Sequence, residues 1–223
     1  MHSRLASRAN TPSRIHRHHG LNGNTCTMSI WYGNHVAAES ELRLCGDLTG
    51  KRVLELGIVG PSNAVLIAQS GAKALVHDPH AHSITAVRSA AERAEVKVEC
   101  HQGELADLGW ATSATIDLVI ASHSLTTVDD VPRVLRQVHR VLRIGAPFVV
   151  AIGHPVAAMF GGETTARMAQ YRYGANTLPF SDLYMMFERS NFHIDTVHEL
   201  TDRRHRDWVT PSVMALRARK VGN

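Results

Sequence analysis

Apolar runs alternate with segments of helical periodicity along most of the chain. The runs are short, rich in Val, Leu and Ile, and predict strands at 53–56, 74–78, 96–100, 116–120 and 147–152. Between them, apolar residues recur every three or four positions, which predicts helices over 38–48, 61–71 and 82–94 and a further one after Asp129 and Asp130. Strands that alternate with helices predict a mostly parallel sheet covered on both faces.

The pattern changes after the fifth run. Residues 155–180 are rich in Gly, Met and Tyr and have weak periodicity, and a helix is expected over 181–190. Two strand-like runs follow at 192–200 and 212–220, and the connection between them is too short for a crossover helix. They should pair antiparallel as a hairpin at the sheet edge. Because Met and aromatic side chains suit an adaptable apolar pocket, residues 155–190 are expected to form a substrate lid.

Composition and charge divide the chain at residue 28. Residues 1–27 contain Arg4, Arg8, Arg14 and Arg17 and no acid, which predicts a disordered basic tail before a single domain over 28–223. The whole chain has 24 Lys and Arg and 20 Asp and Glu. Subtracting the four arginines leaves 20 basic and 20 acidic residues, so residues 28–223 carry no net charge. A neutral body argues against a nucleic-acid partner. The chain has no apolar stretch long enough to cross a membrane, and its three cysteines are far apart, so a cytoplasmic location is expected.

The first two predicted strands end in residues that suit a nucleoside. Glu55-Leu56-Gly57 closes the first strand and leads into a glycine-containing loop, where glycine allows a close backbone approach. Asp78 closes the second strand about 20 residues later, which is the spacing of an acid that binds ribose hydroxyls. Ligands of open α/β sheets bind at the carboxyl ends of the strands. The two strand ends therefore predict a site for a nucleoside-containing cofactor.

Longer segments resemble a known family. The runs VLELGIVGPSNAVLIAQSGAKALVHDP and IDLVIASHSLTTVDDVPRVLRQVHRVLRIGAPFVVAIGHP resemble class I S-adenosylmethionine-dependent methyltransferases, and the likeness extends over about residues 40–220. It implies an α/β fold with a doubly wound, Rossmann-like, seven-stranded sheet of order 3-2-1-4-5-7-6, whose last strand is antiparallel. The small stand-alone type is the most similar, which implies methylation of a small-molecule acceptor with S-adenosyl-L-methionine as cofactor. The acceptor and its reacting atom stay open, as does the oligomeric state.

The resemblance also implies cofactor-binding residues. Glu55 would order the loop and the cofactor's amino group, Gly57 would pass the methionine portion, and Asp78 would hold the ribose. The resemblance also implies that the Glu104 side chain and the Leu105 backbone N–H lie near the adenine. It implies that the segment from Ala121 to His123 lies beside the sulfonium.

The loop departs from the family pattern ExGxGxG, because Val59 and Pro61 replace two of the glycines. Either Gly60 provides the close approach in a shifted loop, or the cofactor binds more weakly. The first explanation is favoured because Pro61 suits the first position of a helix.

Candidate catalytic residues are His123 and His154, which follow the fourth and fifth predicted strands. Methyl transfer from a sulfonium mainly requires alignment, and a general base helps only when the acceptor is a hydroxyl or a protonated amine. Either histidine could instead be a packed or capping residue. His77, His80 and His82 cluster around Asp78, but their spacing favours an exposed turn, so a metal is not expected.

Two other functions stay open. An NAD(P)-dependent reductase could use the same loop and Asp78, although the chain lacks a GxGxxG loop and a Tyr-x-x-x-Lys set. A non-catalytic methyltransferase-like binding protein is the other possibility, and Val59 and Pro61 motivate it.

Overall fold

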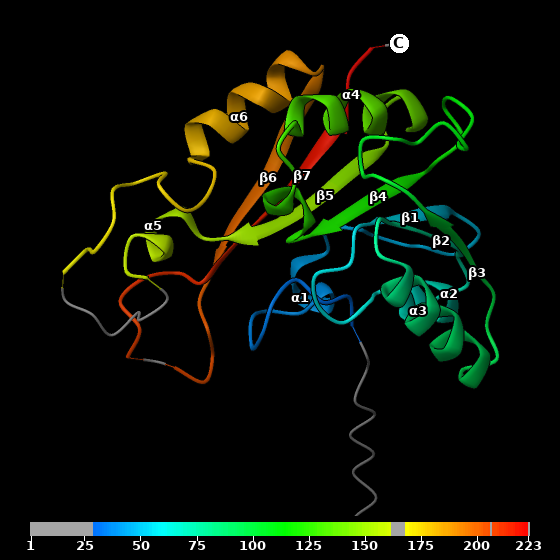
Figure 1. Ribbon diagram of the computed structural model, residues 1–223, viewed down its shortest axis with the longest axis horizontal. Helices are drawn as coiled ribbons and strands as arrows, with labels where there is room; N and C mark the ends of the chain where they lie inside the picture. Colours follow the sequence, from blue (N-terminus) through cyan, green and yellow to red (C-terminus); the bar gives the residue numbers. More distant parts are fainter. Residues whose placement is uncertain (1–28, 162–167, 206, 223) are drawn as a thin grey trace, which may run out of the picture.

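A seven-stranded sheet forms the centre of the computed structural model (Figure 1), which describes residues 29–161, 168–205 and 207–222. The strand order is β3-β2-β1-β4-β5-β7-β6, and only β7 runs antiparallel to its neighbours. This confirms the expected fold class. The strands are β1 Arg52–Leu56, β2 Lys73–Asp78, β3 Val98–Gln102, β4 Leu118–Ser122, β5 Pro147–Gly153, β6 Phe192–Leu200 and β7 Val213–Lys220. The tail expected at 1–27 lies outside the described residues.

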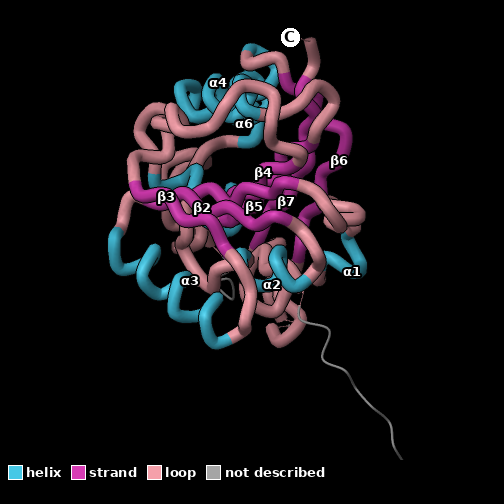
Figure 2. Tube along the Cα trace, turned by 90° about the vertical axis from the view of Figure 1, so that its right-hand side faces the viewer, coloured by secondary structure: helices cyan, strands magenta, loops and turns pink. Residues whose placement is uncertain are grey.

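Helices cover both faces of the sheet (Figure 2). The helices α1 to α3 lie on one face, and α4 and α6 lie on the other. Their bounds are α1 Glu39–Leu42, α2 Ala64–Gln69, α3 Ala81–Arg93, the 3-10 turn η1 Ser124–Thr127, α4 Val131–Val141, α5 Pro155–Ala158 and α6 Phe180–Arg189. No helix in the described ranges is long and apolar enough to cross a membrane.

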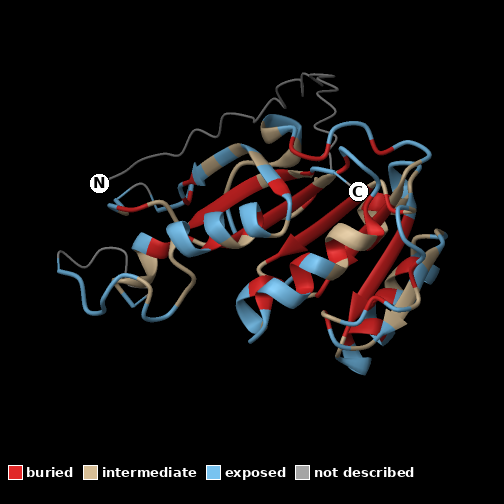
Figure 3. Cartoon of the chain, turned by 90° about the horizontal axis from the view of Figure 1, so that it is seen from above, coloured by how far each residue is buried: buried red, intermediate tan, exposed pale blue. Residues whose placement is uncertain are grey.

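The central strands are buried between these layers, as the red arrows in Figure 3 show. Successive residues of a strand point to opposite faces, so Leu54 and Leu56 join the core under α4 and α6, whereas Val53 joins the core beside α2. Phe148 of β5, Phe187 of α6 and Phe192 of β6 pack with ring centroids 5.7–5.8 Å apart and fix α6 to the sheet.

Two strands begin two residues later than the hydrophobic pattern predicts. β3 starts at Val98 and not at Val96, because the Val96 amide still caps α3 through a hydrogen bond to Ala91 O of 3.0 Å. β4 starts at Leu118 and not at Ile116, since the Ile116 amide bonds to Val141 O at the end of α4. Val96 thus belongs to the turn after α3, whereas Ile116 forms an isolated parallel bridge with Leu142 ahead of β4.

Two helices are shorter than predicted. A helix was expected over 38–48, but α1 ends at Leu42, because Arg43 adopts a left-handed φ of 53°. The amides of Leu44 and Cys45 then donate to the Glu39 carboxylate and not to helix carbonyls. The helix expected from Pro61 begins at Ala64, with Asn63 as its N-cap. Pro61 therefore lies in the loop, and the expectation that it takes the first position of the helix is wrong.

Candidate active site

Gly57 turns the chain sharply at the end of β1. Its φ is +75°, a left-handed value that favours glycine, and its amide donates to His77 O at 2.8 Å. A Cβ at this position would collide with the Cβ of Ser124 and lie 3.0 Å from Cδ1 of Leu105. Both the backbone conformation and the available space therefore require glycine here.

Glu55 organises the loop that follows. Its carboxylate is 2 % exposed and accepts hydrogen bonds from Ser62 Oγ at 2.6 Å, Asn63 N at 2.7 Å and Ala64 N at 3.0 Å. These amides start α2 and lack partners within the helix, so Glu55 satisfies them from β1. Burial raises the pKa of Glu55 to about 7, although the three donors favour its charged form.

Asp78 joins the first two loops at the end of β2. Its side chain is buried; Oδ2 accepts from Ile58 N at 2.7 Å and Oδ1 accepts from His80 N at 2.8 Å. Nδ1 of His80 also lies 3.3 Å from Oδ1. Each carboxylate oxygen can accept about two hydrogen bonds, so Oδ2 retains capacity for a hydroxyl. Asp78 is thus held in place by the backbone and can still accept hydrogen bonds from a ligand.

The loop after β3 lies against the same corner. The amide of Gly103 donates to Asp78 O at 3.1 Å, and the ring of His77 contacts Glu104 O at 2.8 Å. Leu105 is buried and reaches the space above Gly57. The structure therefore gathers the expected adenine and ribose residues around the ends of β1, β2 and β3.

Ala121 is placed differently from the expectation. It lies inside β4, pairs with Val150 of β5 and is 0 % exposed, because the strand is shifted by two residues. Its side chain packs in the core, and the residues that leave the strand at this edge are Ser122, His123 and Ser124.

His123 has one ring nitrogen engaged and one available. It adopts a left-handed φ of 63°, and its Nε2 lies 2.8 Å from the carbonyl oxygen of Tyr32. A carbonyl only accepts, so Nε2 carries the proton and Nδ1 keeps its lone pair. Within the described residues, Nδ1 has no hydrogen-bond partner. Burial lowers the pKa of His123, which favours the neutral ring.

His154 has both ring nitrogens engaged. Nδ1 accepts the amide of Val156 at 3.2 Å and caps α5, so Nε2 donates to Glu199 Oε1 at 3.0 Å. The side chain is buried. In this arrangement His154 is a capping residue, and no lone pair is left to accept a proton.

The segment before α1, which the sequence pattern does not single out, crosses over the glycine loop. The backbone of Trp31 donates to Asn63 Oδ1 at 2.7 Å and accepts from Ser122 Oγ at 2.9 Å. Its indole covers Gly60 and lies tilted beside the His123 ring, with centroids 5.3 Å apart. These contacts join residues far apart in the chain, and the only signal in the sequence is an aromatic pair, Trp31 and Tyr32, ahead of the first helix.

Two cavities open beside these residues. One of about 450 Å³ is lined by Trp31, His123, His205, Trp208 and Val213, among others. The other, of about 300 Å³, includes His154, Tyr173, Phe180, Glu199 and Met214. Val213 and Met214 are successive residues of β7 in different core clusters, so the two cavities lie on opposite faces of the sheet.

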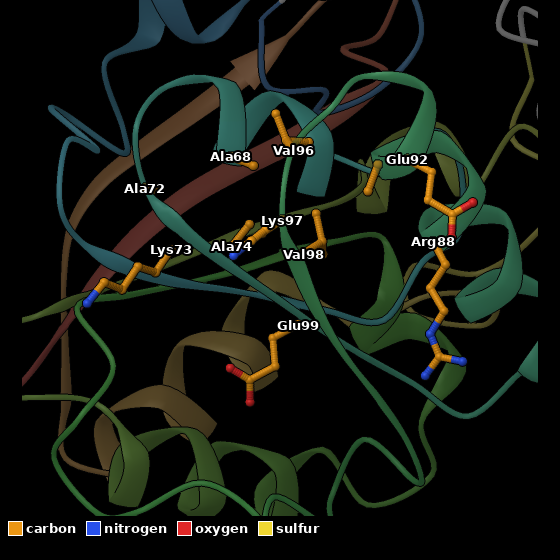
Figure 4. Close-up of a pocket in the computed structure, with 11 residues that line it drawn as sticks. Ala68, Ala72, Lys73, Ala74, Arg88, Glu92, Val96, Lys97, Val98 and Glu99 are labelled. Carbon is orange, nitrogen blue, oxygen red and sulfur yellow. The ribbon is translucent and has the colours of Figure 1, made fainter.

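A larger cavity lies away from this site. It measures about 680 Å³ and lies between α2, α3 and the starts of β2 and β3 (Figure 4). Arg88, Glu92 and Lys97 are among the residues that line it. It lies toward the amino ends of the parallel strands, whereas ligands of such sheets bind at the carboxyl ends.

The described residues contain no group of three or more His, Cys, Asp or Glu side chains that could hold a metal ion. His80 contacts Asp78, and its ring lies 5.3 Å from that of His82.

The central part of the chain matches a known family. Residues 54–150 match the family model described as a methyltransferase domain. Residues 54–150 therefore form a methyltransferase domain. This match covers β1 to β5 almost completely, and the order of the remaining strands completes the fold that the resemblance implied.

Solved structures show the same fold. An S-adenosylmethionine-dependent methyltransferase from Mesorhizobium loti is 21 % identical, with a TM-score of 0.66 over 82 % of this chain and 98 % of that one. One from Aquifex aeolicus is 13 % identical, with a TM-score of 0.60 over 82 % and 89 %. The [4+2]-cyclase SpnF is 17 % identical, with a TM-score of 0.64 over 87 % of each chain. No curated protein matches the sequence significantly.

S-adenosylmethionine is the cofactor of this methyltransferase. The residues at the ends of β1 and β2 fit it, because the buried Asp78 carboxylate is held by two backbone amides and its Oδ2 can still accept a ribose hydroxyl. When bound, the cofactor supplies an activated methyl group.

Proposed function

We propose that this methyltransferase transfers a methyl group to a small-molecule acceptor bound in the 450 Å³ cavity beside His123. The position of that cavity carries the proposal, because Trp31 and His123 line it and also contact the glycine loop and the end of β4. Its volume is in the range of small-ligand sites. The balanced charge of residues 28–223 supports a small acceptor over a nucleic acid.

Each residue of the cofactor site has a proposed role. Asp78 accepts the ribose hydroxyls, the Glu104 side chain and the Leu105 amide contact the adenine, and Gly57 and Gly60 keep the loop close to the methionine portion. Glu55 fixes the loop by binding the amides at the start of α2. Of the segment 121–123 expected beside the sulfonium, Ser122 and His123 keep this proposed role, whereas Ala121 packs in the core.

His123 is the proposed general base. Its Nδ1 can accept a proton from a hydroxyl or ammonium acceptor, while the bond from Nε2 to Tyr32 O fixes the ring. Trp31 shields one side of the imidazole and limits the access of water. His154 instead holds α5 beside the second cavity.

Residues 155–190 are proposed to form the lid, and part of this segment, 162–167, lies outside the described residues. Tyr173 and Phe180 from this segment line the 300 Å³ cavity.

The free thiols of Cys45 and Cys100 support a reducing, cytoplasmic location.

The experiment that tests this function follows the methyl label. The enzyme is incubated with S-adenosylmethionine that carries a labelled methyl group and with a cell extract, and the products are separated by ultrafiltration. Unreacted cofactor also passes a membrane of about 1 kDa, so the filtrate is then resolved by chromatography. We expect the label in small compounds other than the cofactor, in roughly molar proportion to the cofactor consumed. Label retained on protein or nucleic acid would refute a small-molecule acceptor.

The strand order argues against the reductase alternative. Classic dinucleotide-binding sheets run 3-2-1-4-5-6, whereas here the antiparallel β7 lies between β5 and β6. A non-catalytic protein would bind the cofactor and leave the label on it in the same experiment.

A further inference from the structure

His77 is the residue before Asp78 in β2, and its side chain is buried between two loops. Nε2 lies 2.8 Å from the carbonyl oxygen of Glu104, and Nδ1 lies 3.2 Å from the indole nitrogen of Trp110. An indole N–H only donates and a carbonyl only accepts. Nδ1 therefore accepts and Nε2 carries the hydrogen, so these two partners fix both the tautomer and the neutral state of the ring.

The contacts of His77 connect the two parts of the proposed adenosine site. On one side, Asp78 follows it directly in β2 and binds the glycine loop through Ile58. On the other side, the Glu104 carbonyl belongs to the loop expected beside the adenine, and it also accepts the amide of Asp107 at 2.8 Å. His77 is thus the side chain that ties the end of β2 to the turn after β3.

Trp110 completes this arrangement. Its indole stacks in parallel on the ring of His101, with centroids 3.6 Å apart and planes 7° apart. The stack aims the indole N–H at Nδ1 of His77, and Gly103 leaves room for the ring, because a Cβ there would lie 3.1 Å from Cε1 of His77. The geometry is specific to a neutral imidazole.

We propose that His77 is a positioning residue for the adenosine end of the cofactor: its neutral ring, hydrogen-bonded to Trp110 and to the Glu104 carbonyl, holds the loop 103–105 in register with Asp78. This inference rests on the proposed placement of the adenine and ribose. His77 acts through the loop and does not itself contact the cofactor.

Protonation of His77 would break this arrangement. A charged ring donates from both nitrogens, so Nδ1–H would face the indole N–H of Trp110, and two donors would oppose each other. The groups that face the ring are His101, whose charge opposes protonation, and Asp107 and Asp78, whose charges favour it. Burial is the largest effect and lowers the pKa of His77, so the neutral ring is maintained at neutral pH and lost in acid.

The test compares the pH dependence of cofactor binding in matched variants. Titration calorimetry with S-adenosylhomocysteine measures the dissociation constant from about pH 5 to about pH 8 for the full-length protein, His77→Gln, His77→Leu and His101→Gln. Glutamine can donate to the Glu104 carbonyl and accept from Trp110 but takes up no proton. His101→Gln removes a neighbouring titratable ring and its stack on Trp110, but both hydrogen-bonding partners of His77 remain.

We expect the wild type and His101→Gln to lose affinity about fivefold or more toward pH 5, an effect of the size of one hydrogen bond. His77→Gln should bind within about twofold of the wild-type value at pH 7.5 and stay level in acid. His77→Leu should bind about tenfold more weakly at every pH. If His77→Leu fails to fold, the profile of His77→Gln decides alone.

A His77→Gln variant whose affinity falls in acid in parallel with the wild type would overturn the inference. A folded His77→Leu variant with wild-type affinity would overturn it as well. If the wild type itself does not bind S-adenosylhomocysteine, the proposed adenosine site is wrong and this inference fails with it. If the wild type binds and substitutions at residue 77 have no effect, only the role of His77 is wrong.

Discussion

The indole of Trp31 lies on Gly60, so close that a Cβ atom added at residue 60 would come within 2.5 Å of the ring. The φ of Gly60 is not in the left-handed region, so the need for glycine here comes from the contact with Trp31 and not from the backbone conformation. The loop that has Val59 and Pro61 in place of glycines is therefore covered by the Trp31 side chain.

The first prediction concerns this contact. Gly60→Ala should lower the free energy of unfolding by about 1–3 kcal/mol, because the new methyl group displaces the indole. In a Trp31→Ala background the same substitution should cost less than about 0.5 kcal/mol. Urea unfolding of the four proteins in this double-mutant cycle measures the difference. An equal cost in both backgrounds would show that the contact is not the reason for glycine.

The second prediction concerns Asp78. Asp78→Asn should weaken the binding of S-adenosylhomocysteine by about 1–3 kcal/mol, because the amide nitrogen that replaces one carboxylate oxygen only donates and can accept neither a backbone N–H nor a ribose hydroxyl. The matched control is Asp117→Asn at the other end of the sheet, where Asp117 accepts from the amide of Arg52 at 2.8 Å. The control should lower the melting temperature and leave the affinity unchanged. Unchanged affinity in Asp78→Asn would remove Asp78 from the site.

The third prediction concerns the pH dependence of stability. Burial raises the pKa of Glu55 to about 7, so the folded protein binds a proton at Glu55 that the unfolded chain releases above about pH 4.5. The contribution of this proton to stability is complete below about pH 4.5 and is lost as the pH rises through 7. Glu55→Gln has no such proton, and unfolding free energies measured from pH 5 to 8 should vary less steeply with pH than in the wild type. Parallel slopes would contradict the raised pKa.

The fourth prediction separates the two candidate histidines. His123→Ala should reduce kcat by about 10²- to 10⁴-fold for a hydroxyl or ammonium acceptor and remove the acidic limb of the pH–rate profile. Because burial lowers the pKa of His123, that limb should lie below pH 6.5 in the wild type. His154→Gln should keep the limb and mainly reduce stability, since it loses the cap of α5. If the acidic limb disappears in His154→Gln and persists in His123→Ala, the roles of the two histidines are the reverse of those proposed.

The sequence predicts the sheet and the two acidic strand ends because these depend on local patterns. Glu55 and Asp78 lie at the ends of apolar runs, and their spacing follows from one strand–helix–strand unit. Ala121 was expected after the fourth strand but lies within it, because the apolar run does not show that Ile116 forms an isolated bridge and that the strand begins only at Leu118.

The other features depend on contacts between distant segments. Trp31 reaches Gly60 and Ser122 through the packing of an irregular segment, and its local sequence carries no periodic signal. Similarly, the role of His77 depends on Trp110, 33 residues later, and could not be predicted from the histidine alone.

A crystal structure with S-adenosylhomocysteine bound tests the central claim most directly. The account predicts that the ribose hydroxyls lie within hydrogen-bonding distance of the Asp78 carboxylate, with the adenine beside Leu105 and the sulfur near the end of β4. A ligand found elsewhere, or a crevice between Gly57 and Asp78 closed by protein side chains in crystals saturated with the ligand, would contradict it.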